Sequence, residues 1–261
     1  MLIAIRGAGD IASGIAVRLF RCGFSVVMSD IAEPTAIRRT VCFSEAIRLG
    51  SARVEGISAA RADSAEDARR ILSDGRIAVL VDPDALLVRR LCPDVLVDAI
   101  LAKRNLGTSI SDAPLVIGVG PGFTAGVDCH AVVETMRGHT LGRVCYEGSA
   151  KENTGVPGSI GGYTTERILR APCDGVFLGV RRIGDTVRSG EACGYVDGAP
   201  MCAQIDGVLR GILPDGTAVT RGMKSGDVDP RCERSNCFTV SDKALAVGGG
   251  VLEAILALRN R

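Results

Sequence analysis

The chain of 261 residues is long enough for one large domain or two ordinary ones with a substantial core. It is 46% apolar, with 33 glycines, 3% aromatic residues and no tryptophan, a composition typical of α/β or β-rich proteins with many tight turns. The formal net charge of +1 gives no electrostatic case for binding nucleic acid or an anionic membrane. No apolar stretch approaches the roughly 20 residues of a membrane span, and the first is too short for a signal peptide, so we expect a cytoplasmic protein.

The first 30 residues form one unit. An apolar run over residues 2–5 leads into a glycine-rich turn, a helical pattern extends to about Cys22, and a second apolar run ends at Asp30. This order of strand, glycine turn, helix, strand and acid is typical of a dinucleotide-binding unit.

Each residue of this turn has an expected part. Gly7 would allow the tight turn, Gly9 with the adjoining Asp10 would bring the backbone close to a pyrophosphate, and Ala12 would keep the helix near the sheet. The helix N-terminus offers N–H groups to a phosphate, and Asp30 would accept hydrogen bonds from a ribose 2′-hydroxyl. The alternative is a doubly wound domain that keeps the turn for packing and binds no nucleotide.

The next segments alternate between helices and apolar strands. Residues 77–81 and 115–119 are apolar runs, and residues 95–100 form another largely apolar segment, as expected for strands buried on both faces of a mostly parallel sheet. Asp82 and Asp98 lie at the strand ends, on the edge where such sheets bind ligands. The other expected elements are a helix from Pro34 to Leu49, an extended segment from Arg53 to Ala60, a helix from Ser64 to Ser73 opened by a capping box, and a short helix from Ala85 to Leu91.

A second glycine-rich loop, residues 118–126, also leaves the carboxyl end of an apolar strand. It could therefore face the first loop across one crevice, with Gly120, Gly122 and Thr124 contributing to a nest of N–H groups for an anion. The alternative is an irregular connection that needs glycine for its positive φ angles.

Both histidines of the chain follow within residues 130–139. His130 and Glu134 share a face in a helix, about 6 Å apart, or in a strand, about 13 Å apart. The β-branched residues between them and the turn before Leu141 favour a hairpin, so we expect no metal site there. A polar contact with a ligand by His130, Glu134 or His139 is the remaining hypothesis.

Ten cysteines are scattered along the chain without a CxxC pair. In a reducing compartment most of them should be small buried thiols. Cys232 and Cys237 are five residues apart, with no histidine nearby, and we expect a structural role; redox activity or metal binding is the alternative.

The second half contains an internal repeat. Residues 171–196 and 203–228 align without a gap at an offset of 32 residues, and each copy has the pattern of two or three short strands. The sequence resembles the biotinyl/lipoyl carrier fold, a barrel-sandwich. Such carriers present a modified lysine on the hairpin between the halves, here residues 197–202, which contain no lysine. We therefore expect the fold without a carrier function, and no biotin or lipoate.

The expected organisation has four parts. Residues 1–150 would form a Rossmann-like α/β domain with a mostly parallel sheet, and residues 151–165 a linker or lid. Residues 166–236 would form the small duplicated β-sandwich, and residues 237–261 a C-terminal helical segment packing on the first domain. Ser241 would cap a first helix there, and residues 251–258, apolar nearly all round, would form a second, buried one.

Several motifs resemble one bacterial family over essentially the whole chain. They are Arg6–Asp10, Gly120–Asp128, Glu134–His139, Asp227–Arg231, and Ser241–Ala244 continuing through Gly250–Ala254. The family is the YqeB-type accessory proteins of the selenium-dependent molybdenum hydroxylase system. The resemblance implies a role in maturing a molybdenum hydroxylase or preparing its cofactor, beside other accessory factors; it supplies no catalytic residues.

Three functions remain in competition. The first is a maturation factor that binds a nucleotide-bearing ligand, either NAD(P), an adenine dinucleotide or the nucleotide form of the molybdenum cofactor. The second is an NAD(P)-dependent oxidoreductase, for which no residue spacing selects a proton donor. The third is a non-catalytic scaffold whose β module docks a partner enzyme.

Overall fold

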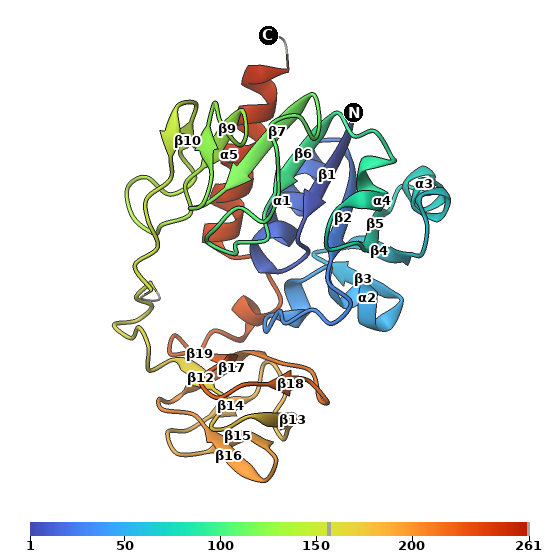
Figure 1. Cartoon of the computed structure of the whole chain (residues 1–261). Helices are drawn as coiled ribbons and strands as arrows, with labels where there is room; N and C mark the ends of the chain where they lie inside the picture. Colours follow the sequence, from blue (N-terminus) through green and yellow to red (C-terminus); the bar gives the residue numbers. More distant parts are fainter. Residues whose placement is uncertain (156–157, 260–261) are drawn as a thin grey trace. The chain divides into compact units, whose positions relative to one another are not determined.

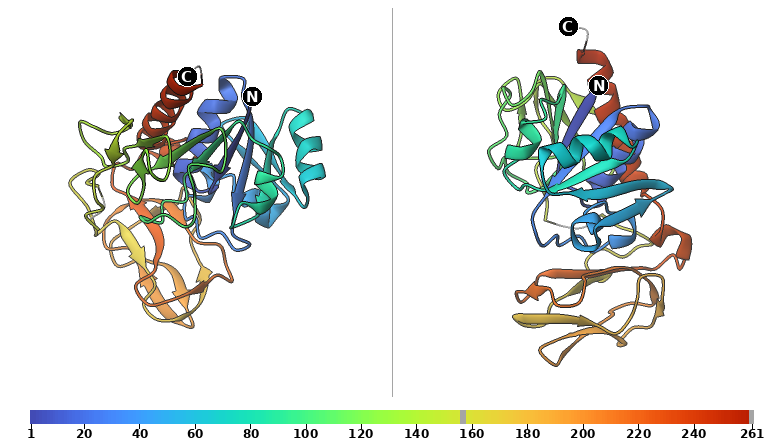
Figure 2. Two further views of the ribbon diagram at one scale, coloured as in Figure 1. Left: turned by 45° about the horizontal axis from the view of Figure 1, so that its top comes forward. Right: turned by 90° about the vertical axis from the view of Figure 1, so that its right-hand side faces the viewer.

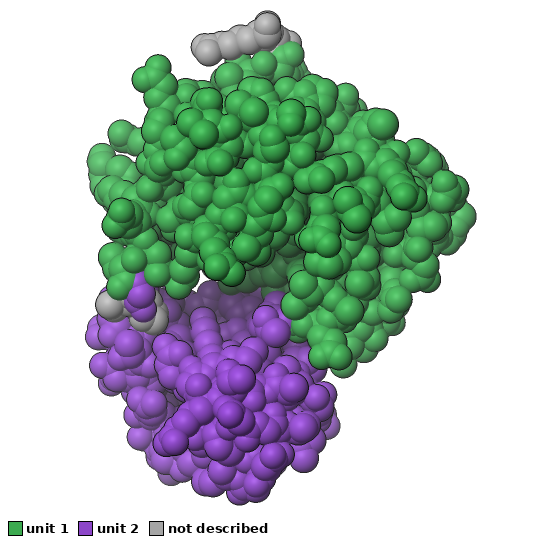
Figure 3. Space-filling view, in the orientation of Figure 1, with its two compact units in different colours: residues 1–34, 42–154, 240–261 green, residues 35–41, 155–239 purple. Residues whose placement is uncertain are grey.

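The computed structural model describes residues 1–155 and 158–259, which form two compact units (Figure 3). Unit 1 comprises residues 1–34, 42–154 and 240–261, and unit 2 comprises residues 35–41 and 155–239. Residues 156–157 of the expected linker, and the last two residues of the chain, lie outside the described residues.

Unit 1 has a mixed α/β architecture built on one large, mostly parallel sheet (Figure 1). Its described strands have the order β10-β9-β7-β6-β1-β2-β5-β4-β3, and only the two edge strands, β10 and β3, run antiparallel to their neighbours. The bounds are β1 (Leu2–Arg6), β2 (Ser25–Asp30), β3 (Ser51–Val54), β4 (Ile57–Ala62), β5 (Ile77–Val81), β6 (Val95–Asp98), β7 (Leu115–Val119), β9 (Ala131–Val133) and β10 (Val144–Cys145); a separate pair is β8 (Thr124–Ala125) with β11 (Gly148–Ser149).

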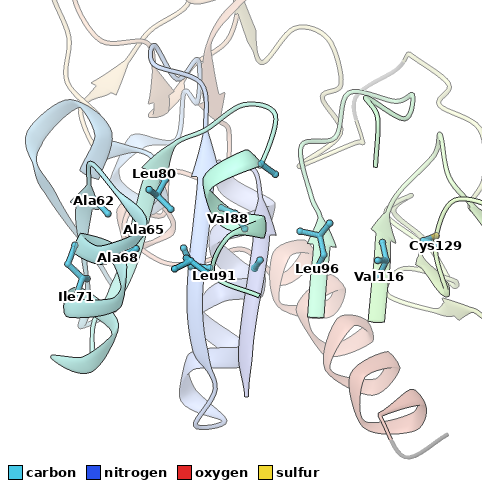
Figure 4. Packing of buried hydrophobic residues seen from close by; sticks show 14 of the residues in the cluster. Ala62, Ala65, Ala68, Ile71, Leu80, Val88, Leu91, Leu96, Val116 and Cys129 are labelled. Carbon is cyan, nitrogen blue, oxygen red and sulfur yellow. The ribbon is translucent and has the colours of Figure 1, made fainter. Parts of the chain in front are cut away.

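Helices cover both faces of this sheet (Figure 2). One face carries α1 (Asp10–Arg21) and α5 (Asp242–Leu258), and the other carries α3 (Ala65–Ser73) and α4 (Leu86–Arg89). The core on the second face contains Leu80, Leu96 and Val116 from the strands and Ile71 and Val88 from the helices (Figure 4). Burial on both faces explains why the central strands are continuous apolar runs.

Helices α1 and α5 pack at very short range because glycines remove side chains from their contact. A Cβ on Gly14 of α1 would lie 2.5 Å from the Cβ of Ala244 on α5. In the same way, a Cβ on Gly250 of α5 would lie 2.2 Å from the carbonyl oxygen of Gly142. The three consecutive glycines are thus part of a single helix, not a break between two helices, and Ser241 caps it by accepting a hydrogen bond from the N–H of Ala244.

In unit 1 the predicted capping box is confirmed, whereas the predicted extended segment at residues 53–60 needs correction. Ser64 accepts a hydrogen bond from the N–H of Asp67 at the start of α3, as expected. Residues 53–60 are not one extended segment: they turn at Glu55 and Gly56, both with positive φ, and join β3 to β4 as a hairpin.

The predicted helix at residues 34–49 is largely wrong. Only η1 (Arg39–Val41) and α2 (Glu45–Leu49) are helical, and residues 35–41 belong to unit 2. The carbonyl of Ile37 accepts a hydrogen bond from the N–H of Ile212, and Nε of Arg39 donates to the carbonyl of Ile212, both at 2.9 Å. Residues 35–38 are not helical, and tertiary hydrogen bonds of this kind override local helix propensity.

The described residues of unit 2 form two four-stranded antiparallel sheets around one core. Their orders are β12-β19-β17-β14 and β16-β15-β13-β18. Both contribute to the same cluster of buried residues, including Phe177, Val196, Leu209 and Val228. The bounds are β12 (Ile168–Arg170), β13 (Gly175–Gly179), β14 (Thr186–Val187), β15 (Ala192–Val196), β16 (Ala199–Cys202), β17 (Gly207–Ile212), β18 (Ala218–Val219), β19 (Lys224–Asp229) and the 3-10 helix η2 (Arg234–Cys237).

The sequence repeat is visible in the strands of unit 2. Strands β13, β14 and β15 begin 32 residues before β17, β18 and β19, so each aligned copy contains three strands, within the two or three expected. Strands β12 and β16, which precede the first and the second copy, are a fourth pair of counterparts. Exchanging each strand for its counterpart converts the order of one sheet into the order of the other. The two copies therefore interlock, each supplying strands to both sheets.

None of the described helices combines the length and the apolar character that crossing a membrane requires.

Candidate functional site

The strand order reverses at β1, and this reversal defines the candidate site. Strand β2, which follows β1 in the sequence, pairs with one side of β1, whereas the later strands β6 and β7 lie on its other side. In open parallel sheets, ligands bind at the carboxyl ends of the strands beside such a reversal. The first glycine loop leaves β1 at this point, and Asp30 ends the neighbouring β2.

The first glycine loop is held closely by the protein itself. Gly7 has a φ of +96°, and its N–H donates to the carbonyl of Ser29 at 2.7 Å. A Cβ on Gly7 would lie 2.8 Å from the carbonyl oxygen of Ala99, so glycine is needed here for contact with the chain as well as for the turn. Gly7 is buried, and Ala12 is packed inside α1, whereas Gly9 and Asp10 are half-buried. The accessible part of the loop is therefore Gly9 and Asp10.

The start of α1 has the features of an anion site. Gly9 precedes the helix and, as glycine, supplies no side-chain cap of its own. The N-terminal N–H groups and the positive end of the helix dipole favour a negatively charged group. Asp10, in the first turn of the helix, is a carboxylate that a phosphate at this end would have to avoid.

Asp30 has a structural role that sequence reasoning missed. Its Oδ2 accepts a hydrogen bond from the N–H of Ala8, and its Oδ1 accepts one from the N–H of Ile31, both at 2.8 Å. The carboxylate thus fixes the glycine loop to the end of β2. Burial raises the pKa of Asp30, and these two hydrogen bonds offset only part of the rise. Because a carboxylate has about four acceptor positions, two remain in principle for a ribose hydroxyl.

A buried ion pair lies at the reversal itself. Arg6 ends β1 and Asp98 ends β6; Nη1 of Arg6 is 3.3 Å from Oδ2 of Asp98, and their side chains are 3% and 2% exposed. Thr108 accepts a hydrogen bond from Arg6 and donates one of 2.6 Å to Asp98. A charged residue of each sign at the ends of two apolar strands was the available sequence signal for this cluster.

Asp82, the other strand-end acid, caps a helix. Its two oxygens accept hydrogen bonds from the N–H groups of Leu86 and Val88, each at 2.9 Å, and the residue is buried. These bonds give acceptors to two N–H groups in the first turn of α4. Capping the helix therefore explains the position of the Asp82 carboxylate, and no ligand is needed to explain it.

The second glycine loop is tied down through its own N–H groups. Gly120 donates to the carbonyl of Val133 at 2.8 Å, and Thr124 donates to Oδ2 of Asp128 at 2.8 Å. A Cβ on Gly122 would lie 2.6 Å from the Cα of Arg104. These contacts favour the alternative of an irregular connection that needs positive φ at Gly120 and Gly122, rather than an open nest for an anion.

The two glycine loops are separated by the segment that follows β6. Strand β6 lies between β1 and β7, and residues 99–104 contact Gly7 at one end and Gly122 at the other. Leu101 and Lys103 within this segment both have positive φ. The expected crevice with one loop on each wall is therefore occupied by residues 99–104, and the site reduces to the first loop with Asp30.

His130 does not lie at this edge of the sheet. It precedes β9, level with Val116 near the start of the parallel strand β7. Its Nδ1 accepts a hydrogen bond from the N–H of Val116 at 3.0 Å, an arrangement that places the proton of the neutral ring on Nε2. The expected role of His130 as the far wall of the crevice is corrected to a backbone contact at the opposite end of the strand.

Glu134 and His139 also have separate surroundings. Glu134 is buried at the end of β9, where its two oxygens accept hydrogen bonds from the N–H groups of Met136 at 2.7 Å and Lys151 at 2.9 Å. His139 is exposed in the connection to β10. The expected hairpin of β9 and β10 is present, but it does not bring these three side chains together.

None of the ten cysteines, all of which the structure describes, forms a disulfide bond. Cys42, Cys129, Cys193 and Cys237 are buried, and burial raises the pKa of Cys129 and of Cys193 to about 11. Cys232 is exposed, whereas Cys237 is buried and its thiol contacts the carbonyl of Leu209. Among the described residues, no three His, Cys, Asp or Glu side chains are grouped so that they could hold a metal ion.

Comparison with known proteins gives one strong sequence match. The chain is 50% identical over 260 residues to an uncharacterized protein, YqeB, of Escherichia coli strain K12. The match covers the whole of this chain and 48% of that protein, so the chain spans about half the length of the curated relative it matches. No protein-family model matches the chain.

Two solved structures show only faint similarity. An aspartoacylase family protein from Mesorhizobium loti gives a TM-score of 0.29 at 14% identity, over 87% of this chain and 84% of that one. A succinylglutamate desuccinylase/aspartoacylase from Rhodobacter sphaeroides gives 0.22 at 30% identity, over 24% of this chain and 21% of that one. At such scores neither structure bears on the fold or chemistry of this chain.

Proposed function

We propose that unit 1 is a Rossmann-like domain that binds the phosphates of a nucleotide-bearing ligand, and that the protein serves as an accessory factor in maturing a molybdenum hydroxylase. The ligand is NAD(P), another adenine dinucleotide or the nucleotide form of the molybdenum cofactor. Its pyrophosphate would lie at Gly9 and the N-terminus of α1, and its ribose beside Asp30.

One arrangement carries the binding part of the proposal. The start of α1, where Gly9 contributes no side-chain cap, adjoins the reversal in strand order, and the half-buried carboxylate of Asp30 lies on the next strand. A helix N-terminus and a carboxylate in this relation match the two ends of a nucleoside diphosphate, because the helix attracts phosphate and the acid accepts from ribose hydroxyls. The maturation role is supported by the sequence similarity to the YqeB protein and the family resemblance of the motifs.

The same proposal includes the fold of unit 2 as a barrel-sandwich without carrier function. The exchange of strands between its sheets supports the duplication. The turn between the halves consists of Asp197 and Gly198, and neither can be lipoylated or biotinylated.

Ligand-dependent thermal stability tests the binding site. The melting temperature of the purified chain is measured with NAD(H), NADP(H), ADP and molybdenum cofactor forms, since a ligand at 100 times its Kd adds about 2.7 kcal/mol to stability. We expect a rise with at least one of them, reduced by Asp30→Asn and unaffected by the exposed matched control Asp74→Asn. The absence of any rise would remove the nucleotide site and leave the scaffold function. Because ribose hydroxyls donate to the ionised carboxylate and the pKa of Asp30 is raised, affinity should fall on acidification in the wild type but not in Asp30→Asn.

The maturation role needs a separate experiment. Deleting the gene in its host should lower molybdenum hydroxylase activity without lowering the amount of hydroxylase polypeptide, and the wild-type gene should restore it. Unchanged hydroxylase activity in the deletion strain would contradict the role even if a nucleotide binds.

A further inference from the structure

One face of unit 2 carries an exposed apolar patch. Val176 and Leu178 of β13, with Val180 just after it, are 46%, 56% and 54% exposed, and Tyr195 of β15 is 38% exposed. Leu178 pairs directly with Tyr195, and Tyr195 pairs with the exposed Pro200 of β16. These side chains are therefore neighbours on one face of the sheet β16-β15-β13-β18. The term apolar face is used below for these five residues.

The apolar face is suited to contact through side chains and not to the addition of a strand. Strand β13 lies inside the sheet, between β15 and β18. Its N–H groups at Val176 and Gly179 donate to the carboxylates of Asp197 and Asp215, at 3.0 and 2.7 Å. With these donors occupied, a partner would have to lie across the sheet.

The internal repeat allows the apolar face to be compared with the equivalent face of the other sheet, β12-β19-β17-β14, and the two faces differ. Leu178 and Tyr195 correspond, 32 residues later, to Arg210 and Asp227. Those two residues are 6% and 4% exposed, and Asp227 forms an ion pair with Arg167. The 3-10 helix η2 lies against β17 there, through the thiol of Cys237. After β15, by contrast, the chain turns back at once through Asp197 and Gly198 to β16, so among the described residues no counterpart of η2 follows β15.

The charges around the apolar face favour a second copy of the same chain. Arg181 and Glu191 form an exposed ion pair at one end, and Asp215 lies beside Gly179, so the rim carries both signs. A two-fold interface must be self-complementary, and a neutral patch with a mixed rim meets this requirement. The four large side chains expose on the order of 300 Å² of apolar surface, which suits the core of an interface that buries about 800 Å² per partner with its polar rim.

We propose that two copies of this chain form a two-fold symmetric dimer through the apolar face, with Leu178 and Tyr195 of each copy packed against the other. The dimer is independent of nucleotide binding, because it uses residues of unit 2 alone.

Sedimentation equilibrium of the full chain tests the dimer. The matched pair of variants is Leu178→Glu and Leu86→Glu: Leu86 is 59% exposed on α4 of unit 1, so both changes place the same charge at equally exposed leucines. We expect a dimer for the wild type and for Leu86→Glu. A charge at the centre of a desolvated interface should raise the dimer Kd at least about 30-fold in Leu178→Glu.

The melting temperature of each variant shows whether it remains folded. If Leu178→Glu does not fold, the dimer Kd of Tyr195→Glu is measured instead. A monomeric wild type at about 100 µM overturns the proposal, since a specific interface of this size should be populated there. A dimer that persists unchanged in both unit 2 variants also overturns it. If the wild type is monomeric and binds a different protein through the apolar face, that protein is the partner, and the dimer is equally contradicted.

Discussion

Single residues at the carboxyl edge of the unit 1 sheet combine charge with burial. Arg6 and Asp98 are both nearly inaccessible and contact each other at the reversal in strand order. Burying two charges is expensive, and their attraction compensates only while both are present.

Replacing Asp98 by Ala should therefore lower the free energy of unfolding by about 3–5 kcal/mol, because Arg6 would be left as an uncompensated buried charge. Urea denaturation measures the change. Asp74→Ala is the control: it breaks an exposed ion pair with Arg76, whose members are 37% and 49% exposed, and should cost less than about 1 kcal/mol. Equal losses for the two variants would show that Arg6 and Asp98 are not coupled as the geometry requires.

The cysteines should differ sharply in reactivity. A pKa of about 11 for Cys129 and Cys193 leaves roughly 0.1% thiolate at pH 8, and burial also blocks access. Exposed Cys22, Cys92 and Cys232 should therefore be alkylated first by iodoacetamide at pH 8, as peptide mass spectrometry of the native protein would show. Cys129 and Cys193 should react only after denaturation. Early modification of either would mean that the structure around that cysteine opens in the native state.

At the level of elements, the sequence predicted what periodicity and turn chemistry determine. The apolar runs at 77–81 and 115–119 are β5 and β7, and the box at Ser64 opens α3. Long-range contacts decided the rest. The segment around Ile37 is not an α-helix because it hydrogen-bonds to Ile212, and nothing near Ile37 in the sequence indicates that partner.

The candidate site was predictable only in outline for a similar reason. The glycine turn at Gly7 and the acid at Asp30 are local patterns, and both lie at the carboxyl edge of the sheet. The segment 99–104 between the loops, and the backbone contact of His130, depend on strand order and register. A one-dimensional pattern places residues near a strand end but does not show which connection fills the space beside it.

The glycines of α5 give a matched pair of substitutions in one helix. Gly249 has no heavy atom within 4 Å of its Cβ position, whereas that of Gly250 lies 2.2 Å from the carbonyl oxygen of Gly142. Gly249→Ala should stabilise the protein by about 0.5–1 kcal/mol, because alanine loses less backbone entropy in a helix. Gly250→Ala should destabilise it by about 1–3 kcal/mol through overpacking. Thermal unfolding of the two variants checks the opposite signs, and a gain in stability for Gly250→Ala would show that α5 does not pack as described.

At the scale of the whole molecule, sequence order and structural unit do not coincide. Residues 35–41 lie between β2 and α2 of unit 1 in the sequence but belong to unit 2, and the chain returns to unit 1 at residue 240 for α5. Each unit is therefore completed by a segment that is distant from the rest of it in sequence. A fragment cut at residue 155 would leave unit 2 without residues 35–41 and unit 1 without α5.

The contribution of residues 35–41 can be measured in the intact chain. Ile37 is half-buried against the core of unit 2, and its carbonyl accepts from Ile212 of β17. Ile37→Ala removes part of that packing, so it should weaken unit 2 by about 1 kcal/mol and speed hydrogen exchange about fivefold at β17 amides that exchange through local opening. The amides of α1 in unit 1 should keep their exchange rates, and Thr35→Ala, at an exposed position of the same segment, should leave both unchanged. Faster exchange in α1 and β17 alike would mean that the two units open together, and the segment would then stabilise the whole chain rather than unit 2.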